Sequence, residues 1–512
     1  MIPLITNTLQ KLRALRGKRA DLAAAVLGAL SALALPPLYI FPALLIAIPG
    51  LLALLDGAPN GRTALRRGFV FGFAHHICGL YWITSAILIE AAQFWWFVPF
   101  AVPATALILA PFIAVPCAVA RLALPNAPRA LLLAAAWVLG DLARQFVATG
   151  FPWNPLGSAL AFPGPLGSLL IAPAALIGVQ GLTFFTIWFA ATPGQNKRFF
   201  FGAMAGAALW LGLGDWLLHR PAGAAPNFSI ALIQGNESER DKQDQITAAQ
   251  GFEHSLQLTR EAMQAAGNRP TIVVWPETGA DPYLVEQDPN VRAAISAAGA
   301  GARGFLIGSV RYPSPDPAAK PFNSLIALAP TGDVLTHYDK WHLVPFGEYT
   351  PPLGILGLKI SPGTGFDAGP GPATLHLPGI PAVAPLICYE AVFPAQGVDP
   401  TDRPDWLVNI TNDAWFGNSS GPRQHLMAAR LRAVEEGLPL MRAANTGISA
   451  GFDAHGNELG RLGMNRPGFL ILPLPGALPP TPFARFGLWI PFLLSLLAAA
   501  ISLKSRILSQ YR

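Results

Sequence analysis

The chain has 512 residues, of which 52% are hydrophobic and only 12% are charged, and its mean hydropathy is +0.41. This balance excludes a wholly soluble protein and is typical of a polytopic membrane protein. The net charge of +6 does not indicate nucleic-acid binding, because the basic residues form no face interleaved with aromatic residues and lie instead at the ends of apolar runs.

Apolar runs fill most of the chain up to Leu218, and one more lies near the C-terminal end. A helix that crosses the hydrocarbon core of a bilayer needs about 20 apolar residues. The sequence therefore predicts eight membrane spans, near Ala20–Leu35, Tyr39–Leu55, Gly68–Ile89, Trp95–Leu122, Arg129–Phe146, Leu166–Ala191, Phe199–Leu218 and Phe486–Leu503.

The first span has a second interpretation, as a secretory signal peptide. It follows a basic segment, and Ala32-Leu33-Ala34 has the small residues of a cleavage site. Further apolar runs follow directly, which favours an uncleaved membrane anchor.

Basic clusters lie before the first predicted span and after the second, fourth, sixth and eighth. Their members are Lys11, Arg13, Arg16, Lys18 and Arg19; Arg62, Arg66 and Arg67; Arg121 and Arg129; Lys197 and Arg198; and Lys504 and Arg506. Basic residues in short loops are retained on the cytoplasmic side of a membrane. This pattern predicts that both termini are cytoplasmic and that the segment between spans seven and eight faces the other compartment.

That segment has ordinary charge density and alternates short apolar runs with amphipathic stretches. The predicted strands are Ser229–Gln234, Thr271–Trp275, Gly304–Val310, Ser324–Ala329, Ala384–Cys388 and Trp406–Ile410. The predicted helices are Asp241–Ala266 and Arg423–Leu438. Such alternation indicates a layered α/β sandwich with the helices outside.

One predicted strand ends in Cys388, which Tyr389 and Glu390 follow directly. Taken alone, a cysteine at this point is as well explained as a small buried hydrophobic residue. The other two cysteines, Cys78 and Cys117, lie in predicted spans, so a disulfide partner for Cys388 in its own domain is missing from the sequence. An unpaired thiol in an oxidising compartment favours a functional role.

Three other stretches carry polar residues that bear on the site, and the first and third of them lie at or just beyond a predicted strand. They are Val273–Thr278, which contains Glu277; Tyr338–Tyr349, which contains Lys340; and Asn409–Gly417, which contains Asn412-Asp413. Each has a structural explanation when it is taken singly: a turn carboxylate, a solvated charge and a helix cap.

Together and in this order, these stretches resemble the nitrilase superfamily, whose Glu-Lys-Cys triad lies at the ends of neighbouring strands. The chain is more similar still to the membrane-embedded branch of that superfamily, the apolipoprotein N-acyltransferase family of Gram-negative bacteria, and the resemblance covers nearly the whole chain. The motifs that carry it are Trp275-Pro276-Glu277, Lys340-x-x-Leu343-Val344-Pro345-Phe346-Gly347-Glu348, Cys388-Tyr389-Glu390, Thr149-Gly150-Phe151-Pro152-Trp153 and Gln234-Gly235-Asn236.

The resemblance implies that Cys388 is the nucleophile, Glu277 the general base and Lys340 the electrostatic stabiliser. The chemistry asks for the same residue types, because a thiol with an ordinary pKa of about 8.5 needs a neighbouring base or cation to become nucleophilic. The Lys340 ammonium and the backbone amide of Tyr389 would stabilise the oxyanion.

Further roles follow from the same resemblance. Glu348, Tyr389 and Glu390 would support the site, and a hydrogen-bonding role without direct chemistry is equally open for them. Trp153, Trp415 and Phe416 would bind substrate, and Trp415-Phe416 and Pro351–Gly365 would be mobile loops near the membrane opening. No cofactor or metal is expected, since the rings of the adjacent His75 and His76 point in different directions on a helix.

One stretch departs from the family pattern. After Gln234-Gly235-Asn236 the family often continues with isoleucine, proline and glutamine and then a tryptophan, whereas this chain has Glu237–Gln243 with no aromatic residue. The departure puts in doubt any lipid or acceptor contact that an aromatic residue makes there.

We therefore expect a membrane domain at residues 1–222, a nitrilase-like catalytic domain at 223–475 in the periplasm, and a last span with a cytoplasmic tail at 476–512. The resemblance implies an enzyme of the bacterial inner membrane. It would transfer an acyl chain from a phospholipid, through a cysteine thioester, to the α-amine of the N-terminal diacylglyceryl-cysteine of an apolipoprotein, with ping-pong kinetics.

Two other functions are consistent with parts of the sequence. A membrane-bound nitrilase-type amidase would use the same triad with water as the final nucleophile, although eight spans exceed what tethering needs. A transporter would explain the number of spans, but these contain few paired charges and no evident duplicated half.

Overall fold

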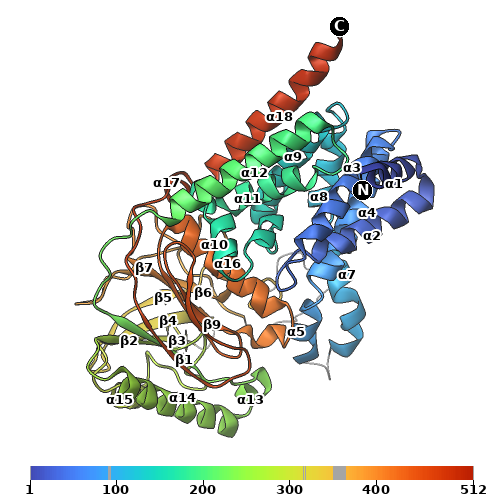
Figure 1. Ribbon diagram of the computed structural model, residues 1–512. Helices are drawn as coiled ribbons and strands as arrows, with labels where there is room; N and C mark the ends of the chain where they lie inside the picture. The colour runs from blue at the N-terminus through green and yellow to red at the C-terminus, as the bar shows by residue number, and fades with distance from the viewer. Residues whose placement is uncertain (1, 90–93, 315, 317–318, 350–364, 511–512) are drawn as a thin grey trace. The chain divides into compact units, whose positions relative to one another are not determined.

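The computed structural model describes residues 2–89, 94–314, 316, 319–349 and 365–510. The chain divides into two compact units, Met1–Arg220 with Arg485–Arg512, and Pro221–Ala484. The first unit is helical and the second is a layered α/β unit (Figure 1). Pro351–Gly365, predicted to be a mobile loop, lies outside the described residues except for Gly365.

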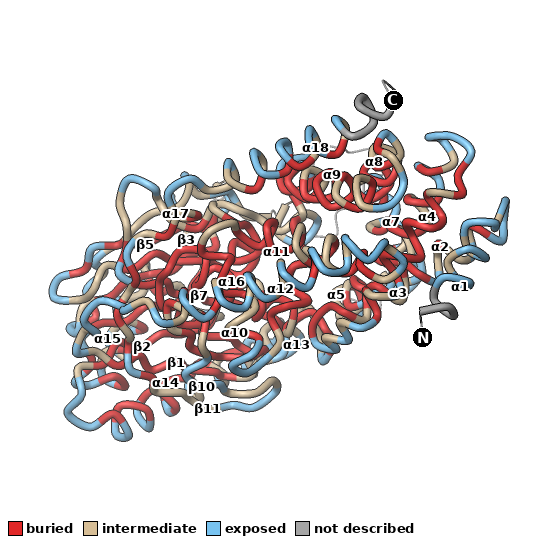
Figure 2. Tube along the Cα trace, turned by 45° about the horizontal axis from the view of Figure 1, so that its top comes forward, coloured by how far each residue is buried: buried red, intermediate tan, exposed pale blue. Residues whose placement is uncertain are grey.

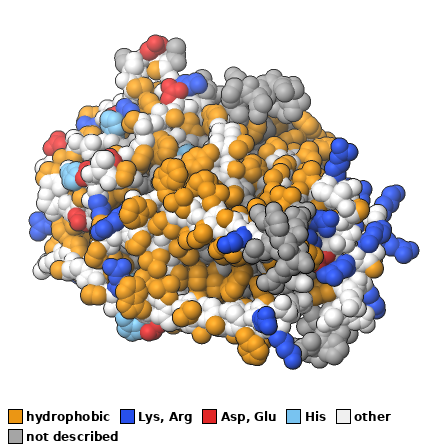
Figure 3. Space-filling view, turned by 90° about the horizontal axis from the view of Figure 1, so that it is seen from above, with side chains coloured by type: hydrophobic (Ala, Val, Ile, Leu, Met, Phe, Trp, Pro, Cys, Tyr) orange, Lys and Arg blue, Asp and Glu red, His pale blue; other side chains and the backbone are white. Residues whose placement is uncertain are grey.

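The helical unit is built from α-helices and short connecting turns. Its main helices are α1 (Ile2–Ala14), α2 (Gly17–Ala32), α3 (Leu44–Asp56), α4 (Gly61–Gly79), α5 (Ile83–Ile89), α7 (Val98–Leu109), α8 (Pro111–Ala120), α9 (Ala127–Phe146), α10 (Pro165–Ile171), α11 (Ala174–Ala190), α12 (Lys197–Leu218) and α18 (Trp489–Gln510). Many of its exposed side chains are large and apolar, such as Leu209 and Trp489. Figure 3 shows hydrophobic side chains over a broad part of the surface, with many of the Lys and Arg side chains toward its edges. Such a surface suits a lipid environment better than water.

By length and composition, two helical stretches among the described residues can cross a membrane, Trp95–Ala120 and Lys197–Leu218. Two bent pairs also qualify if each is one span: Gly61–Gly79 with Ile83–Ile89, and Pro165–Ile171 with Ala174–Ala190. Between two and four of the predicted spans are thus supported, and the number eight stays a prediction.

The predicted span at Arg129–Phe146 forms α9, which is not uniformly apolar. Arg129, Asp141 and Arg144 are all buried in it, and Arg144 Nη2 lies 3.0 Å from Asp141 Oδ1. Charges inside an apolar helical unit are expensive unless they are paired, so this helix faces the protein interior along part of its length.

The α/β unit contains two sheets. The six-stranded sheet has the order β11-β1-β2-β3-β4-β5, and the five-stranded sheet has the order β10-β9-β8-β7-β6. The strands are β1 (Ser229–Gln234), β2 (Thr271–Val274), β3 (Gly304–Arg311), β4 (Phe322–Leu328), β5 (Val334–Asp339), β6 (Val383–Ile387), β7 (Trp406–Thr411), β8 (Leu440–Ala444), β9 (Ser449–Phe452), β10 (Glu458–Leu462) and β11 (Gly468–Pro473).

Apolar side chains from both sheets form one buried cluster, which includes Leu232 of β1, Leu306 of β3 and Val408 of β7. On the outer face of the six-stranded sheet, a second cluster joins the strands to α14 (Gln245–Ala266) and α15 (Pro289–Ala298), with Phe252 and Ile295 among its members. On the other sheet, α16 (Gly421–Glu436) is buried against β8. The layers are therefore helix, sheet, sheet and helix, and burial is concentrated in the two central layers (Figure 2).

This arrangement confirms the predicted α/β sandwich, and the six predicted strands correspond to β1, β2, β3, β4, β6 and β7. The predicted helix at Asp241–Ala266 is instead two helices, α13 (Glu239–Gln243) and α14, because the Asp244 side chain accepts from the Thr247 amide at 2.9 Å and starts a new helix. The sequence analysis missed β5 and β8–β11, some of which are half-exposed or carry charged residues.

The topology brings several strand ends to one edge. Strands β1, β2 and β3 are mutually parallel, as are β6, β7 and β8. β5 is antiparallel to β4, which is antiparallel to β3, so β5 runs in the same direction as β3. The carboxyl ends of parallel strands meet at the same edge of a sheet, so Glu277 after β2 and Lys340 after β5 share an edge.

We predict that Gly308→Ala destabilises the α/β unit. A Cβ at Gly308 would lie 2.0 Å from the Pro276 carbonyl oxygen and 2.8 Å from Glu277 Cα, so the backbone that carries Glu277 would have to move. Overpacking of this kind costs about 1–3 kcal/mol, measurable as a lower melting temperature of the purified protein. Gly463→Ala is the matched control, because a Cβ there meets no atom within 4 Å. Equal melting temperatures for the two variants would contradict the prediction.

Candidate active site

Cys388 follows β6 directly and begins the 3-10 turn Cys388–Val392. Its backbone has a φ of +49°, a left-handed conformation that is uncommon for residues other than glycine. Cys388 is 6% exposed and belongs to the apolar cluster between the two sheets. A strained residue at a strand end is a known feature of functional sites, and here it turns the chain sharply at the thiol.

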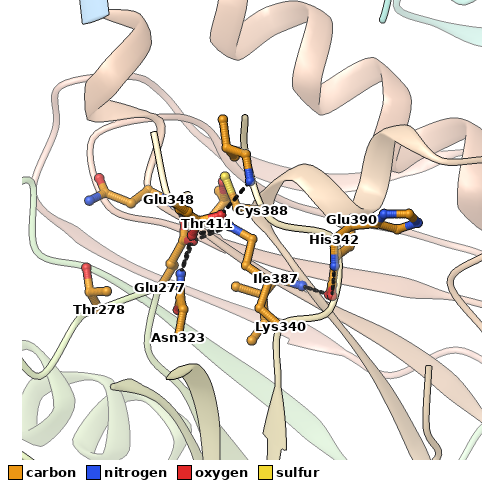
Figure 4. A network of polar contacts seen from close by, with 12 residues as sticks. Glu277, Thr278, Asn323, Lys340, His342, Glu348, Ile387, Cys388, Glu390 and Thr411 are labelled. Atoms are coloured by element: carbon orange, nitrogen blue, oxygen red, sulfur yellow. Dashed lines mark hydrogen bonds and ion pairs between the residues drawn. The ribbon is translucent and has the colours of Figure 1, made fainter. Parts of the chain in front are cut away.

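Lys340 lies between two carboxylates. Its Nζ is 3.0 Å from Glu277 Oε1 and 2.8 Å from Glu348 Oε1, and the lysine is 1% exposed. Figure 4 shows the side chains of Glu277, Lys340 and Glu348 converging beside the Cys388 sulfur. The structure thus brings together the three residues that were predicted to form the triad, and it adds Glu348 as a second carboxylate on the same ammonium.

Two asparagines hold the carboxylates in place. Asn323 Nδ2 donates to Glu277 Oε1 at 2.7 Å and to Glu348 Oε1 at 2.9 Å. The backbone amide of Asn412 donates to Glu277 Oε2 at 2.7 Å, and the Val344 amide donates to Glu348 Oε2 at 2.8 Å. Both oxygens of each carboxylate are therefore occupied by donors, which fixes their orientation toward Lys340.

The charges of the cluster support one another. Burial lowers the pKa of Lys340, but the attraction of Glu277 and Glu348 is stronger, and the net result is a pKa raised well above the ordinary value. Burial raises the pKa of Glu277, but the charge of Lys340 and the hydrogen bonds from Lys340, Asn323 and Asn412 outweigh this effect, so the pKa lies below its ordinary value. At neutral pH the lysine is therefore protonated and Glu277 is ionised.

The thiol of Cys388 behaves differently. Burial and the charge of Glu277 raise its pKa well above the ordinary value, although Lys340 and a hydrogen bond with Thr411 act in the opposite direction. The resting group is thus a thiol rather than a thiolate. A nucleophile of this kind must lose its proton to a base as it attacks, and Glu277 is an ionised carboxylate beside it.

Glu390 ties the turn of Cys388 to the chain that carries Lys340. Its Oε2 accepts from the Ile387 amide at 2.7 Å, and its Oε1 accepts from the Trp341 amide at 2.8 Å and from the Tyr338 hydroxyl at 3.0 Å. Burial raises the pKa of Glu390 to about 7. Glu390 thus accepts hydrogen bonds from the chain on both sides, and it connects the turn at Cys388 with the segment that follows β5.

The other predicted site residues lie in different places. The Tyr389 ring is buried and meets Phe393 edge to face, with ring centroids 5.1 Å apart. Trp415 and Phe416 are half-buried in the turn Asp413–Phe416, and the Phe416 ring lies 6.0 Å from the ring of His425.

In the helical unit, Trp153 is buried, and the centroid of its ring lies 4.8 Å from that of Trp82. The backbone carbonyl of Trp153 accepts from Arg144 Nη1 at 2.9 Å. His75 Nδ1 lies 2.8 Å from the Ser31 hydroxyl. Substrate binding by Trp153, Trp415 and Phe416 stays a prediction.

The stretch that departs from the family pattern is joined to the site by Asn412 and Asn445. Asn445 Oδ1 accepts from the Glu237 amide at 2.8 Å, and Asn445 Nδ2 donates to the Glu237 carbonyl at 2.7 Å. Asn445 Nδ2 also donates to Asn412 Oδ1 at 3.1 Å. The Asn412 side chain donates to Glu239. Carboxylates and amides thus anchor this segment to the residue whose amide holds Glu277.

Sequence reasoning missed Asn323 and the asparagine contacts of Glu277. Asn323 lies with Ser324 at the start of β4, where small polar residues are ordinary and give no catalytic signal. Asn412 was singled out only as a helix cap, and it does accept from the Ala414 amide at 3.3 Å. Asn412 contacts Glu277 through its backbone amide, and a backbone contact cannot be inferred from the type of the residue.

A family model described as carbon-nitrogen hydrolase matches residues 229–475, and one described as apolipoprotein N-acyltransferase N-terminal domain matches residues 27–192. The fold, the buried cysteine and the first of these matches define an enzyme of the carbon-nitrogen hydrolase class.

Close relatives specify the family. The apolipoprotein N-acyltransferase of Bradyrhizobium diazoefficiens is 39% identical, over 97% of this chain and 96% of the relative. That of Allorhizobium ampelinum is 37% identical over 89% of each chain. The chain belongs to the apolipoprotein N-acyltransferase family, as the motifs indicated, and it is an acyltransferase. A solved structure of the amidase from Nesterenkonia sp. AN1 matches with a TM-score of 0.35 and 19% identity, over 50% of this chain and 94% of the amidase.

We predict that Asn323→Leu slows acylation of the site cysteine at least tenfold. The substitution keeps the branching of the side chain but removes the donor that Glu277 and Glu348 share, and the loss of a buried hydrogen bond to a charged group costs about 1.5–3 kcal/mol. The single-turnover rate of acylation and the melting temperature should both fall. Asn290→Leu, at an exposed position in the first turn of α15, is the control and should match the wild type in both. A wild-type acylation rate in folded Asn323→Leu would contradict the prediction, because it would show that the Asn323 side chain is not needed to orient the carboxylates.

Proposed function

We propose that this enzyme transfers an acyl chain from a membrane phospholipid to the α-amine of the N-terminal diacylglyceryl-cysteine of an apolipoprotein, through a thioester on Cys388. The observation that carries the proposal is the buried lysine between two carboxylates beside the thiol, with Nζ 3.0 Å from Glu277 and 2.8 Å from Glu348. Family membership supplies the substrates, and the geometry supplies a role for each side chain.

The first half-reaction forms the thioester. Glu277 takes the thiol proton as the sulfur of Cys388 attacks the ester carbonyl of the phospholipid. Negative charge then develops on the carbonyl oxygen, where the Lys340 ammonium and the Tyr389 amide stabilise it. When the intermediate collapses, the C–O bond breaks, Glu277 returns the proton to the leaving oxygen, and a lysophospholipid departs.

The second half-reaction uses the same groups. The α-amine of the acceptor attacks the thioester carbonyl and Glu277 accepts a proton from the amine. The C–S bond then breaks to give an amide, and Glu277 returns the proton to the sulfur of Cys388, which regenerates the thiol. Because the two substrates react in turn at one sulfur, kinetics should be ping-pong. The low exposure of Cys388 limits the access of water, which favours transfer over hydrolysis.

The membrane arrangement belongs to the same proposal. Eight spans, with domain limits at 1–222, 223–475 and 476–512, would place both termini in the cytoplasm and the catalytic domain in the periplasm. The basic clusters support this orientation, and the apolar helices support residence in the bacterial inner membrane. Both substrates carry acyl chains, whose exposure to water would cost about 0.8 kcal/mol per methylene, so a membrane-embedded enzyme avoids that cost.

We predict that incubation of the purified protein with phospholipid and no acceptor adds one fatty-acyl mass to Cys388, detected by intact-protein mass spectrometry. The adduct should be absent in Cys388→Ala. It should also be absent in Cys388→Ser, because the same base generates an alkoxide far less readily than a thiolate.

Addition of a diacylglyceryl-cysteine peptide should discharge the wild-type adduct and produce an amide. Cys78→Ala is the matched control, since it removes another cysteine and should leave the adduct intact. An adduct that water clears as fast as the peptide does would favour the amidase-type hydrolase, and the absence of any adduct on the wild type would refute the proposal.

A further inference from the structure

A second buried charge network lies on the other side of Cys388. His425 of α16 is fully buried; its Nε2 is 2.8 Å from the backbone carbonyl oxygen of Cys388, and its Nδ1 is 2.8 Å from Asp413 Oδ1. Asp413 also accepts from Arg442 Nη2 at 2.6 Å and from the Thr411 hydroxyl at 3.1 Å. The proposed mechanism uses none of these side chains directly.

The partners of His425 determine which ring nitrogens carry a proton. A carbonyl oxygen can only accept, so Nε2 must donate to it. The Asp413 carboxylate can only accept as well: burial raises its pKa, but Arg442 and His425 outweigh that effect and leave a pKa of about 2. Arg442 Nη2 also approaches Nδ1, but at 3.3 Å and with Asp413 as its nearer acceptor. Nδ1 must therefore donate too.

We infer that His425 is an imidazolium that donates to both Asp413 and the Cys388 carbonyl, and that it acts as a positioning residue for acyl transfer by fixing and polarising the Cys388–Tyr389 peptide. This inference rests on the proposed function, because it concerns how the oxyanion is stabilised at Cys388.

The effect follows from the structure of a peptide group. The carbonyl of Cys388 and the N–H of Tyr389 belong to one trans peptide, so they point in opposite directions. A charged donor on the carbonyl draws electron density from the amide and makes the N–H a stronger donor to an oxyanion. The same hydrogen bond holds Cys388 at its strained φ of +49°.

Charge balance gives His425 a second effect. Glu277, Glu348 and Lys340 together carry one excess negative charge, which opposes formation of a thiolate or an oxyanion. With His425 doubly protonated, Asp413, Arg442 and His425 carry one excess positive charge. The two networks then offset each other around the reacting atoms, whereas a neutral imidazole would leave the negative charge uncompensated.

The protonation state can be measured on the unaltered protein. We would incorporate ¹⁵N-histidine into the full chain in lipid bilayers and record solid-state NMR spectra at about pH 8. The groups that face His425 include Asp413, Arg442, the Cys388 carbonyl and the Phe416 ring, and Asp413 is ionised at this pH.

Of the nine histidines, one ring should show two N–H protons with the hydrogen bonds of His425, and its signals should be missing in His425→Gln. A bare nitrogen on every ring at that pH would overturn the inference without any variant.

The kinetic test uses acylation of Cys388 in single turnovers. His425→Gln can still donate one hydrogen bond but carries no charge, so the rate constant should fall about 10- to 100-fold while the KM for phospholipid stays within twofold, because the interaction is made in the transition state. His376→Gln is the matched control: His376 Nε2 also lies 2.8 Å from a carboxylate, Asp402, but its side chain is 63% exposed. The control should acylate at the wild-type rate.

Unchanged acylation in folded His425→Gln, or an equal loss in the control, would overturn the inference. If His425→Gln does not fold, the wild-type spectrum still decides it. If the wild type forms no acyl-enzyme, the proposed function fails whatever the state of the ring, so the two failures are distinguishable.

Discussion

The structure depends on one lysine ammonium that is removed from water and placed between two carboxylates. Burial of an isolated charge costs several kcal/mol, and Lys340 at 1% exposure meets that cost only because Glu277 and Glu348 both contact it. The three groups come from different parts of the chain, after β2, after β5 and in the loop that follows. The sandwich must therefore form correctly before the charges can be paired.

This constraint explains the supporting residues. Asn323 and the Asn412 amide occupy the remaining positions on Glu277, so the carboxylate cannot rotate away from Lys340. Glu390 joins the turn of Cys388 to the Trp341 amide next to Lys340, which fixes the distance between nucleophile and ammonium. The network of Asp413, Arg442 and His425 contacts Cys388 through its backbone, where His425 binds the carbonyl oxygen. The thiol is thus protonated at rest and held in a fixed position, and it loses its proton to Glu277 only as it attacks the substrate.

Much of this could be predicted from the sequence. Apolar runs of strand length predicted β1, β2, β3, β4, β6 and β7, and they placed Glu277 and Cys388 at strand ends, whereas Lys340 was identified by the family resemblance because β5 was missed. β8 was missed because its five residues include Arg442, a charge that makes sense only beside Asp413, 29 residues earlier. Asn323 and His425 gave no signal because a single polar residue inside a strand or helix is ordinary. Their importance arises from contacts with residues 46 and 37 positions away, which only the folded chain brings together.

The most direct test of the account is the rate at which phospholipid acylates Cys388 in Lys340→Met, a variant of similar length that has no charge. If the buried ammonium stabilises the oxyanion and keeps Glu277 ionised, the variant should insert and retain its helical and sheet content by circular dichroism. Its acylation should be slower by a factor of about 10²–10³ or more. Acylation within twofold of the wild-type rate would contradict the account, because it would show that the charge on which the whole site is built is not needed for the reaction.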